Sequence, residues 1–312
     1  MRRWYKLLPD RVNSRAARAI RLPPLNFPGS ALTPMNAIEF SLLIALASML
    51  AGFLGALTGL GGGVVIVPLL AVVFKVDIHY AIGASLVSVI ATSSGAAAAY
   101  VREGYSNIRV GMFLEIATTV GAIFGAYLAV FTPTHAIAIV FGIVLLFSAA
   151  ASARRRAAPH ASLPADRLAG LLRLEGTYPS AGQMQSYAVR RVPLGFGLMF
   201  GAGTLSGLLG IGSGAVKVLA MDEAMKIPFK VSTTTSNFMI GVTAAASAGI
   251  YLSRGYISPA LDMPVTLGVL AGSLIGARLL VIARTNVIRI VFAAVIALLG
   301  MEMIFSGITG RL

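Results

Sequence analysis

A lysine within a long apolar stretch is the residue of this chain best suited to bind charge. Lys217 lies in GIGSGAVKVLAMDEAMK, residues 210–226. A related stretch at 59–75, GLGGGVVIVPLLAVVFK, carries Ile66 at the matching position. If the second stretch lies in a membrane, its lysine costs about 2.5–3.5 kcal/mol on insertion scales, so a partner must offset that cost. Three readings stay open: a bound anionic substrate, a carboxylate from another helix, or a neutral lysine.

Small polar side chains follow the lysine in the run VSTTTSNF, which opens the next apolar segment. Their hydroxyl and amide groups suit ligands that are rich in oxygen. We expect Ser232 and Thr233 to cap the start of a helix there, and the deeper side chains to reach a binding site. The deeper residues that we predict to bind substrate are Thr234, Ser236 and Asn237. The first half reads AIGASL at the matching place, so the second half is predicted to carry the chemistry of the site.

Two carboxylates lie within apolar segments, Glu115 and Glu302. Such groups often bind the proton or sodium ion that drives a transporter, so we predict both as coupling candidates. The alternative is pairing with a nearby basic side chain or a place at the membrane interface. The chain has no cysteine, which excludes disulfide, thiolate and iron–sulfur chemistry. Because no cluster of His, Cys or carboxylates marks a reaction centre, we expect no enzyme, no metal site and no cofactor.

The composition is that of a membrane protein. Of 312 residues, 57% are apolar and only 12% are charged, which is far from an ordinary soluble domain. A helix needs about 20 apolar residues to cross the hydrocarbon core. The windows of about this length are 40–58, 80–101, 110–131, 136–153, 192–209, 231–253, 263–283 and 290–310. These runs do not alternate in polarity, so we predict an all-α polytopic membrane protein.

The basic residues gather at two places, which explains the formal net charge of +14. One is the tail 1–36 and the other is the hydrophilic segment 154–191, and both flank apolar segments. Lysine and arginine in such places set membrane topology and attract anionic lipid. We therefore expect the lipid bilayer of the cell (inner) membrane as a partner, with the chain multi-pass in it, and no nucleic acid.

The chain is an internal duplication. Shifting it by 151 residues places 52–147 on 203–298 without a gap, and about a quarter of the positions carry the same residue. Such repeats are common in secondary transporters. Each half makes an odd number of crossings whether or not its hairpin spans the bilayer, so the halves must be inverted. The predicted organisation is a basic N-terminal tail (1–36), a first membrane repeat (37–153), a basic hydrophilic linker (154–191) and a second membrane repeat (192–312).

Each repeat is predicted to combine a glycine-broken, re-entrant hairpin with three transmembrane helices. Glycine tolerates the backbone angles that end one helix and begin another, and irregular backbone survives in lipid only where protein or a cavity shields it. The two breaks should therefore meet inside the protein, with the start of a half-helix beside each, where an anion fits. The residues that we predict to bind it through their backbone or hydroxyl groups are Gly59, Gly61, Gly62, Gly63, Gly210, Gly212, Ser213 and Gly214.

The two stretches resemble the TauE/SafE family of membrane proteins, also called the sulfite exporter or TSUP family. The resemblance rests on GALTGLGGGVVIVPLLAVVF, on GLLGIGSGAVKVLAMDEAMKIPFKVSTTTSNF and on the repeated Gly-Tyr loops, and it covers about residues 37–310. The signature of the family is a G-x-G-G-G break followed by a proline, here Pro68. The second half departs from it, with Ser213 in place of a glycine and Leu219 in place of the proline.

The resemblance implies a transporter of sulfite, sulfonates or related sulfur-containing or organic anions. Together with the repeat, it predicts a secondary transporter that works by alternating access, with a small anionic substrate and a possible coupling proton or sodium ion as partners. We expect Lys217 to neutralise the substrate. An anion channel is the alternative function, and a membrane-embedded enzyme is a weaker one.

Overall fold

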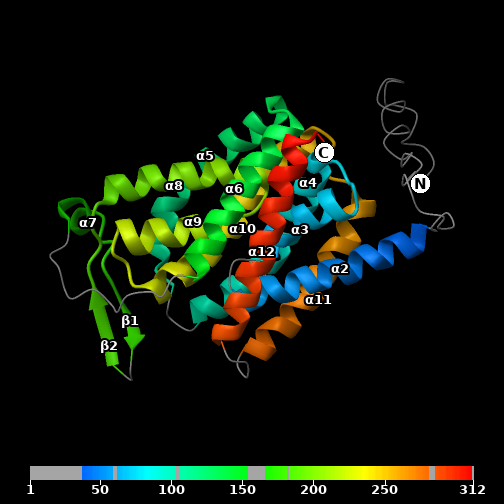
Figure 1. The fold of residues 1–312 in the computed structure, drawn as a ribbon. Coiled ribbons are helices and arrows are strands. Elements are labelled where there is room, and N and C mark those ends of the chain that lie inside the picture. Colours follow the sequence, from blue (N-terminus) through cyan, green and yellow to red (C-terminus); the bar gives the residue numbers. More distant parts are fainter. Residues whose placement is uncertain are drawn as a thin grey trace, which may run out of the picture. The chain divides into compact units, whose positions relative to one another are not determined.

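The computed structural model describes residues 37–58, 62–102, 106–153, 166–180, 183–280 and 285–310, and these are mostly helical (Figure 1). Residues Phe40–Leu312 form one compact unit. The elements of the first half are α2 (Ala37–Thr58), α3 (Gly63–Pro68), η1 (Leu69–Val73), α4 (Ile78–Arg102), α5 (Ile108–Phe131) and α6 (Thr134–Ala153). Those of the second half are α8 (Val192–Leu209), α9 (Gly214–Leu219), η2 (Ala220–Ala224), α10 (Phe229–Ser253), α11 (Pro259–Leu280) and α12 (Thr285–Ile308).

Several of these helices are long and apolar enough to cross a membrane. Among the described residues, the long candidates are Ile38–Gly55, Ile108–Phe131, Val192–Leu209 and Pro259–Gly276. Shorter apolar helices lie at Gly63–Val73, Ile78–Ser93, Thr134–Ala150 and Ala293–Ile308. Large apolar side chains cover the outside of the helices, as lipid contact requires.

A short helical piece doubles back along the first helix of each half. In the second half, the backbone N–H of Arg190 donates to the carbonyl of Met225 at 3.0 Å, so the end of η2 lies beside the start of α8. In the first half, the rings of Phe40 and Phe74 pack edge to face with centroids 6.0 Å apart. In each half, the end of the short piece therefore lies beside the start of the first helix.

The π-helical turns η1 and η2 end the two short pieces in the same way. In each, the last bond spans five residues, from Phe74 N to the Leu69 carbonyl and from Met225 N to the Ala220 carbonyl. Pro68 precedes the first of these turns, and it lacks an N–H to donate. Because Leu219 precedes the same turn in the second half, the proline is not what produces it.

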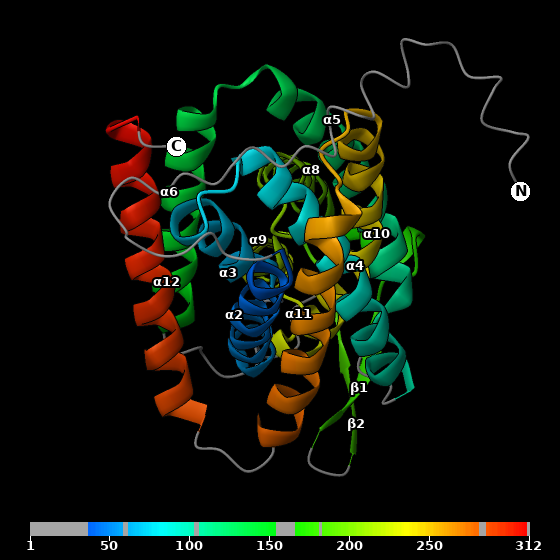
Figure 2. The same ribbon diagram turned by 90° about the vertical axis from the view of Figure 1, so that its right-hand side faces the viewer.

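The helices recur at the spacing of the sequence repeat. Adding 151 to the bounds of α3, η1 and α4 gives those of α9, η2 and α10, and it carries the first residues of α5 and α6 onto those of α11 and α12. The contacts recur too, with the partners exchanged between halves. Helix α8 packs on α5, and α2 packs on α11, whereas α6 lies beside α12 (Figures 1 and 2). The two halves therefore interlock.

Glycines permit these close helix contacts. A Cβ at Gly203 or Gly207 of α8 would collide with the carbonyl of Thr118 or Ala122 on α5. A Cβ at Gly272 of α11 would collide in the same way with the carbonyl of Met49 on α2. Since backbone meets backbone at these points, no side chain can move aside to make room.

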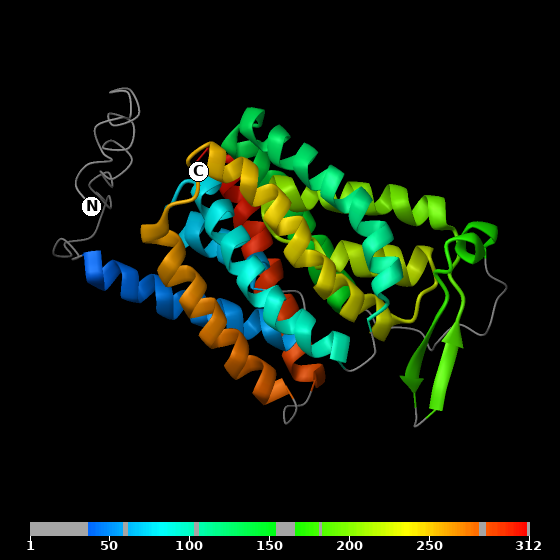
Figure 3. The same ribbon diagram turned by 180° about the vertical axis from the view of Figure 1, so that it is seen from behind.

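The linker forms structure that the sequence analysis did not predict. It contains the short helix α7 (Arg167–Leu171) and an antiparallel hairpin of β1 (Gly176–Ser180) and β2 (Gln183–Tyr187), which lies at one end of the helices (Figure 3). The chain is therefore mostly helical and not all-α as predicted. The reason is that Leu174, Tyr178 and Val189 are buried against the ends of α5 and α8, so this hydrophilic segment has a small core of its own.

The linker is tied to the start of α5. Asn107 caps this helix by accepting a hydrogen bond from Val110 N, and its amide nitrogen donates to the Leu174 carbonyl at 3.1 Å and to the Tyr187 hydroxyl at 2.6 Å. Burial raises the pKa of the Tyr187 phenol. The hairpin thus marks the end of the molecule at which α5 begins.

Two alanine substitutions on α8 test the glycine contacts. We expect Gly207→Ala to lower the stability of the protein in detergent by about 1–3 kcal/mol, because the added Cβ overlaps α5. Gly201 lies on the same helix with nothing near its Cβ position, so Gly201→Ala should stabilise the helix by up to about 1 kcal/mol. Thermal unfolding measures both. Equal effects of the two substitutions would contradict this account of α8 packing.

Candidate anion-binding site

The two chain breaks lie against each other. The hydroxyl of Ser85, on α4, donates to the carbonyl of Gly210 at 2.7 Å and lies 3.4 Å from the carbonyl of Gly63. On the other side, the hydroxyl of Ser236 on α10 donates to the Gly214 carbonyl at 3.3 Å. One serine from each long helix thus holds the start of a half-helix. Of the predicted backbone ligands, Gly62, Gly63, Gly210, Gly212 and Gly214 are all buried here, whereas Gly59 and Gly61 lie outside the described residues.

The second break has a left-handed backbone. Gly210 and Gly212 have φ angles of 69° and 67°, which glycine adopts without strain. A Cβ at Gly212 would come within 2.8 Å of Ile240. Ser213 is also left-handed, with φ 45°, although it is not a glycine. Its hydroxyl is buried and has no hydrogen-bond partner among the described residues, which leaves a polar group available to a ligand.

Lys217 is completely buried, and it reaches a carboxylate through a threonine. Its Nζ donates to Oγ1 of Thr243, on α10, at 2.6 Å. The Thr243 hydroxyl in turn lies 2.7 Å from Oε1 of Glu115, on α5. Of the three readings of this lysine, the structure shows the second, a carboxylate from another helix. That helix belongs to the other half of the chain, and the lysine reaches the carboxylate through one bridging hydroxyl.

Glu115 has unused hydrogen-bonding capacity. It is only 8% exposed, and its Oε1 also accepts from the Thr119 hydroxyl at 3.2 Å. Its Oε2 is buried without a partner among the described residues. The hydroxyl of Thr243 has a second acceptor, the Met239 carbonyl at 2.9 Å, and only one hydrogen to donate. The Thr243 hydroxyl can therefore donate its hydrogen to the Met239 carbonyl in place of Glu115.

The remaining predicted site residues occupy different places. Thr234 is buried and donates to the carbonyls of Lys230 and Val231, and Asn237 is half-buried on α10. The structure does not bring Glu302 to the site, because its side chain is exposed on α12, where it accepts from the Ser306 hydroxyl at 3.4 Å. Its role as a coupling residue stays a prediction.

The capping prediction for Ser232 and Thr233 is wrong. Helix α10 begins at Phe229, three residues earlier than the first of them. Both hydroxyls donate to carbonyls that precede them, those of Ile227 and Phe229. Pro228 stands at the cap position with no side-chain hydrogen bond, so the whole polar run lies inside the helix.

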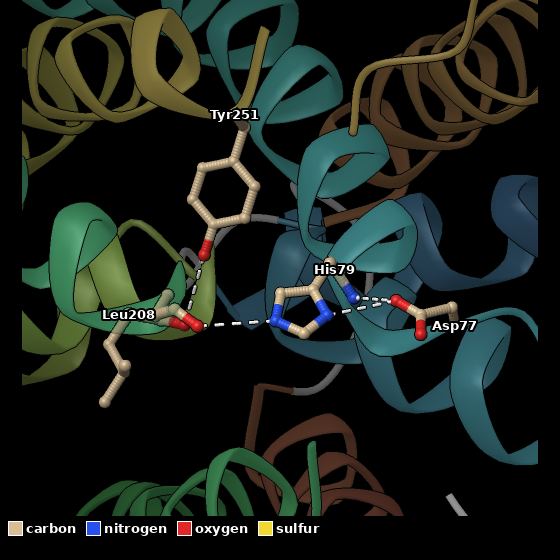
Figure 4. Close-up of polar contacts among 5 residues, drawn as sticks. Asp77, His79, Leu208 and Tyr251 are labelled. Atoms are coloured by element: carbon tan, nitrogen blue, oxygen red, sulfur yellow. Dashed lines mark hydrogen bonds and ion pairs between the residues drawn. The ribbon is translucent and has the colours of Figure 1, made fainter. Parts of the chain in front are cut away.

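A tyrosine anchors the end of α8 just before the second break. The Tyr251 hydroxyl lies 3.2 Å from the Gly207 carbonyl and 3.4 Å from that of Leu208 (Figure 4).

Asp77 and His79 form a hydrogen-bonded pair nearby. Asp77 accepts from the backbone N–H of His79, and the hydrogen bond between their side chains lowers the pKa of the Asp77 carboxyl. Nε2 of His79 lies 3.3 Å from the Ala129 carbonyl near the end of α5.

Sequence reasoning missed three residues of functional interest: Ser85, Thr243 and Asp262. The first two are repeat positions at which both halves carry the same residue, Ser85 with Ser236 and Thr92 with Thr243. Identity of a polar residue in two otherwise diverged halves was the available signal. Asp262 lies just before a predicted window, and nothing local distinguishes it from a loop residue.

A double-mutant cycle tests the buried link. Removing one charge should destabilise the protein by about 3–5 kcal/mol, because the other charge stays buried without its partner. We therefore expect Lys217→Met combined with Glu115→Gln to cost clearly less than the sum of the single changes in thermal unfolding. The half-buried Lys226 forms a pair at 3.9 Å with the exposed Glu223, and the same cycle there should show a coupling below about 1 kcal/mol. Additive effects at the buried pair would contradict the link.

Comparisons with known proteins agree with a membrane transporter. A family model described as sulfite exporter TauE/SafE matches residues 44–303. The chain is 28% identical to "Probable membrane transporter protein YunE" of Bacillus subtilis (strain 168), over 87% of this chain and 99% of that protein. It is 26% identical to "Probable membrane transporter protein YdhB" of the same organism, over 85% of this chain and 100% of that protein. "Probable membrane transporter protein MJ0441" of Methanocaldococcus jannaschii is 25% identical over 85% of this chain and 97% of its own length. No solved structure gives a significant match. Because the family model spans most of the chain, this multi-pass membrane protein belongs to the sulfite exporter TauE/SafE family of transporters.

Proposed function

We propose that this transporter carries small anions, with sulfite, sulfonates or related sulfur-containing or organic anions as its substrates, across the inner cell membrane by alternating access. One observation carries the proposal: Lys217 is a wholly buried cation on the first turns of the half-helix that follows the second break. A buried cation attracts an anion strongly, since no water screens it. The printed name of the family model supports the choice of substrate class.

The substrate would lie between Lys217 and the second break. The ammonium group has three hydrogens, and one of them goes to Thr243. The unpartnered hydroxyl of Ser213 lies at the cap of the same short helix, four residues earlier. Together they supply a charge and a hydrogen-bond donor to an oxyanion, and the hydroxyl of Ser236 keeps the helix start in place.

Glu115 would compete with the substrate for Lys217. While the carboxylate is ionised, the link through Thr243 neutralises the lysine. When Glu115 takes a proton, the lysine charge is left for the anion, so that a proton and an anion bind together. Release of the proton would restore the link and expel the anion. Alternating access would follow from movement of one repeat against the other around this site.

Anion uptake into proteoliposomes tests the role of Lys217. A panel of sulfite, thiosulfate, sulfate, sulfonates and carboxylates should include at least one substrate with saturable uptake and counterflow, whereas an unsaturable conductance would indicate a channel. Lys217→Met should weaken anion affinity by about 2–5 kcal/mol, at least about thirtyfold. Lys226 follows the same short piece, which ends at Ala224, so Lys226→Met is the matched control and should transport normally. Unchanged anion binding by Lys217→Met would overturn the proposal.

Replacing Ser213 by glycine separates binding from folding. The substitution removes the hydroxyl and also relieves the left-handed strain, which costs roughly 1–2 kcal/mol for a non-glycine residue. We therefore expect Ser213→Gly to be at least as stable as the parent in thermal unfolding. Its anion affinity should fall by about 1.5–3 kcal/mol, the loss of one hydrogen bond to a charged group. Parental affinity in this variant would exclude the hydroxyl from the site.

A further inference from the structure

A second buried carboxylate lies on α11, the helix that corresponds to α5 in the repeat. Asp262, in the first turn of α11, is 4% exposed. Its backbone N–H donates to the Ser258 carbonyl at 2.8 Å, but neither side-chain oxygen has a partner in the part of the chain that the structure describes. Thr266, one turn further on the same face, also has an unpartnered hydroxyl.

The repeat shows why this carboxylate lacks a cation. With the shift of 151 residues, Thr266 corresponds to Glu115, and Asp262 to a position one turn before it. The residue that corresponds to Lys217 is Ile66, which lies with Val269 of α11 beside Gly62 at the first break. Each half thus has one carboxylate on the equivalent helix, but only one half has the lysine.

The titratable groups on the elements around Asp262 are engaged elsewhere. On α4, His79 contacts Asp77 and stacks on Tyr256 with centroids 4.9 Å apart, and Tyr80 packs edge to face on the same ring. On α2, the titratable residue near the start is Glu39. Because it is acidic, it does not supply a cation to Asp262. Among the described residues, no ion pair reaches Asp262.

A proton fits this site better than a metal ion. An ionised carboxylate buried without a partner is so unfavourable that the group becomes neutral instead. Hard cations require several oxygen ligands, whereas the described residues contain no group of three acidic or histidine side chains able to hold one. Thr266 alone does not complete a coordination shell.

The two carboxylates lie near opposite ends of the helices. Glu115 is two turns from the start of α5, the end that is tied to the linker through Asn107. The start of α11 follows Tyr256, which stacks on His79, and His79 reaches Ala129 near the other end of α5. Asp262 is therefore placed to exchange protons at the end opposite the linker.

We propose that Asp262 is a proton-binding site of this transporter. Its carboxylate takes up one proton from the side opposite the linker to form a neutral carboxylic acid, and it releases that proton and becomes a carboxylate again when α11 moves against its neighbours. Proton binding stands by itself, whereas its coupling to anion movement rests on the proposed function.

Infrared spectroscopy of the purified protein tests proton binding. At neutral pH the parent should show the carbonyl stretch of a protonated carboxylic acid, which shifts in heavy water, and Asp262→Asn should lose it. Glu302→Gln removes an exposed carboxylate of α12 as a control and should keep the band. Asp262→Glu should keep it at a shifted position, which guards against a folding defect in the Asn variant. A spectrum of Asp262→Asn equal to that of the parent would overturn the proposal.

Uptake driven by a proton gradient tests the coupling. If Glu115 and Asp262 each carry one proton with every monovalent anion, a gradient of about one pH unit at zero membrane potential supports an about hundredfold accumulation of the anion. The parent should approach this value, and the accumulation should fall to about tenfold in Asp262→Asn, which keeps the proton of Glu115. Parental accumulation in the variant would overturn the coupling. If no anion is transported by the parent, the proposed function fails, while the infrared band still decides whether Asp262 binds a proton.

Discussion

The buried charge of Lys217 is the constraint on which the rest of the site depends. An ammonium group without water must have a partner, and here the partner is reached through Thr243 on α10 and ends at Glu115 on α5. The lysine and α10 belong to the second half, whereas α5 belongs to the first. This polar link therefore joins the two repeats, and any ligand of the lysine alters how the halves are held together.

Close backbone packing makes that link possible. Gly203 and Gly207 bring α8 against α5, and equivalent contacts bring α2 against α11, so each half contributes a helix to the other. The same exchange places Gly63 and Gly210 within reach of one serine hydroxyl. Irregular backbone inside a membrane protein must be shielded from lipid, and here each break is shielded by the other half.

Divergence between the halves assigns them different chemistry. Both halves have a serine on the long helix and a threonine two turns later. However, Lys217 in the second half corresponds to Ile66 in the first, and Thr266 corresponds to Glu115. The charged link therefore runs from Lys217 in the second half to Glu115 in the first, whereas Asp262, also in the second half, has no partner for its side chain among the described residues. In our proposals, the repeated scaffold with its unequal polar groups carries two proton-binding carboxylates near opposite ends of the helices, Glu115 with a cation linked to it and Asp262 without one.

The sequence by itself determined the membrane helices and the two breaks, because apolar length and glycine content are properties of short windows. It also determined the repeat, which appears when the chain is compared with itself at a shift of 151 residues. It also identified Lys217 as a buried charge in need of a partner. Only the tertiary structure decided what that partner is, since Glu115 and Thr243 lie 128 residues apart. Burial of Asp262, exposure of Glu302 and the small core of the linker likewise depend on which helices pack together. These contacts connect distant segments, so no periodicity along the chain could have revealed them.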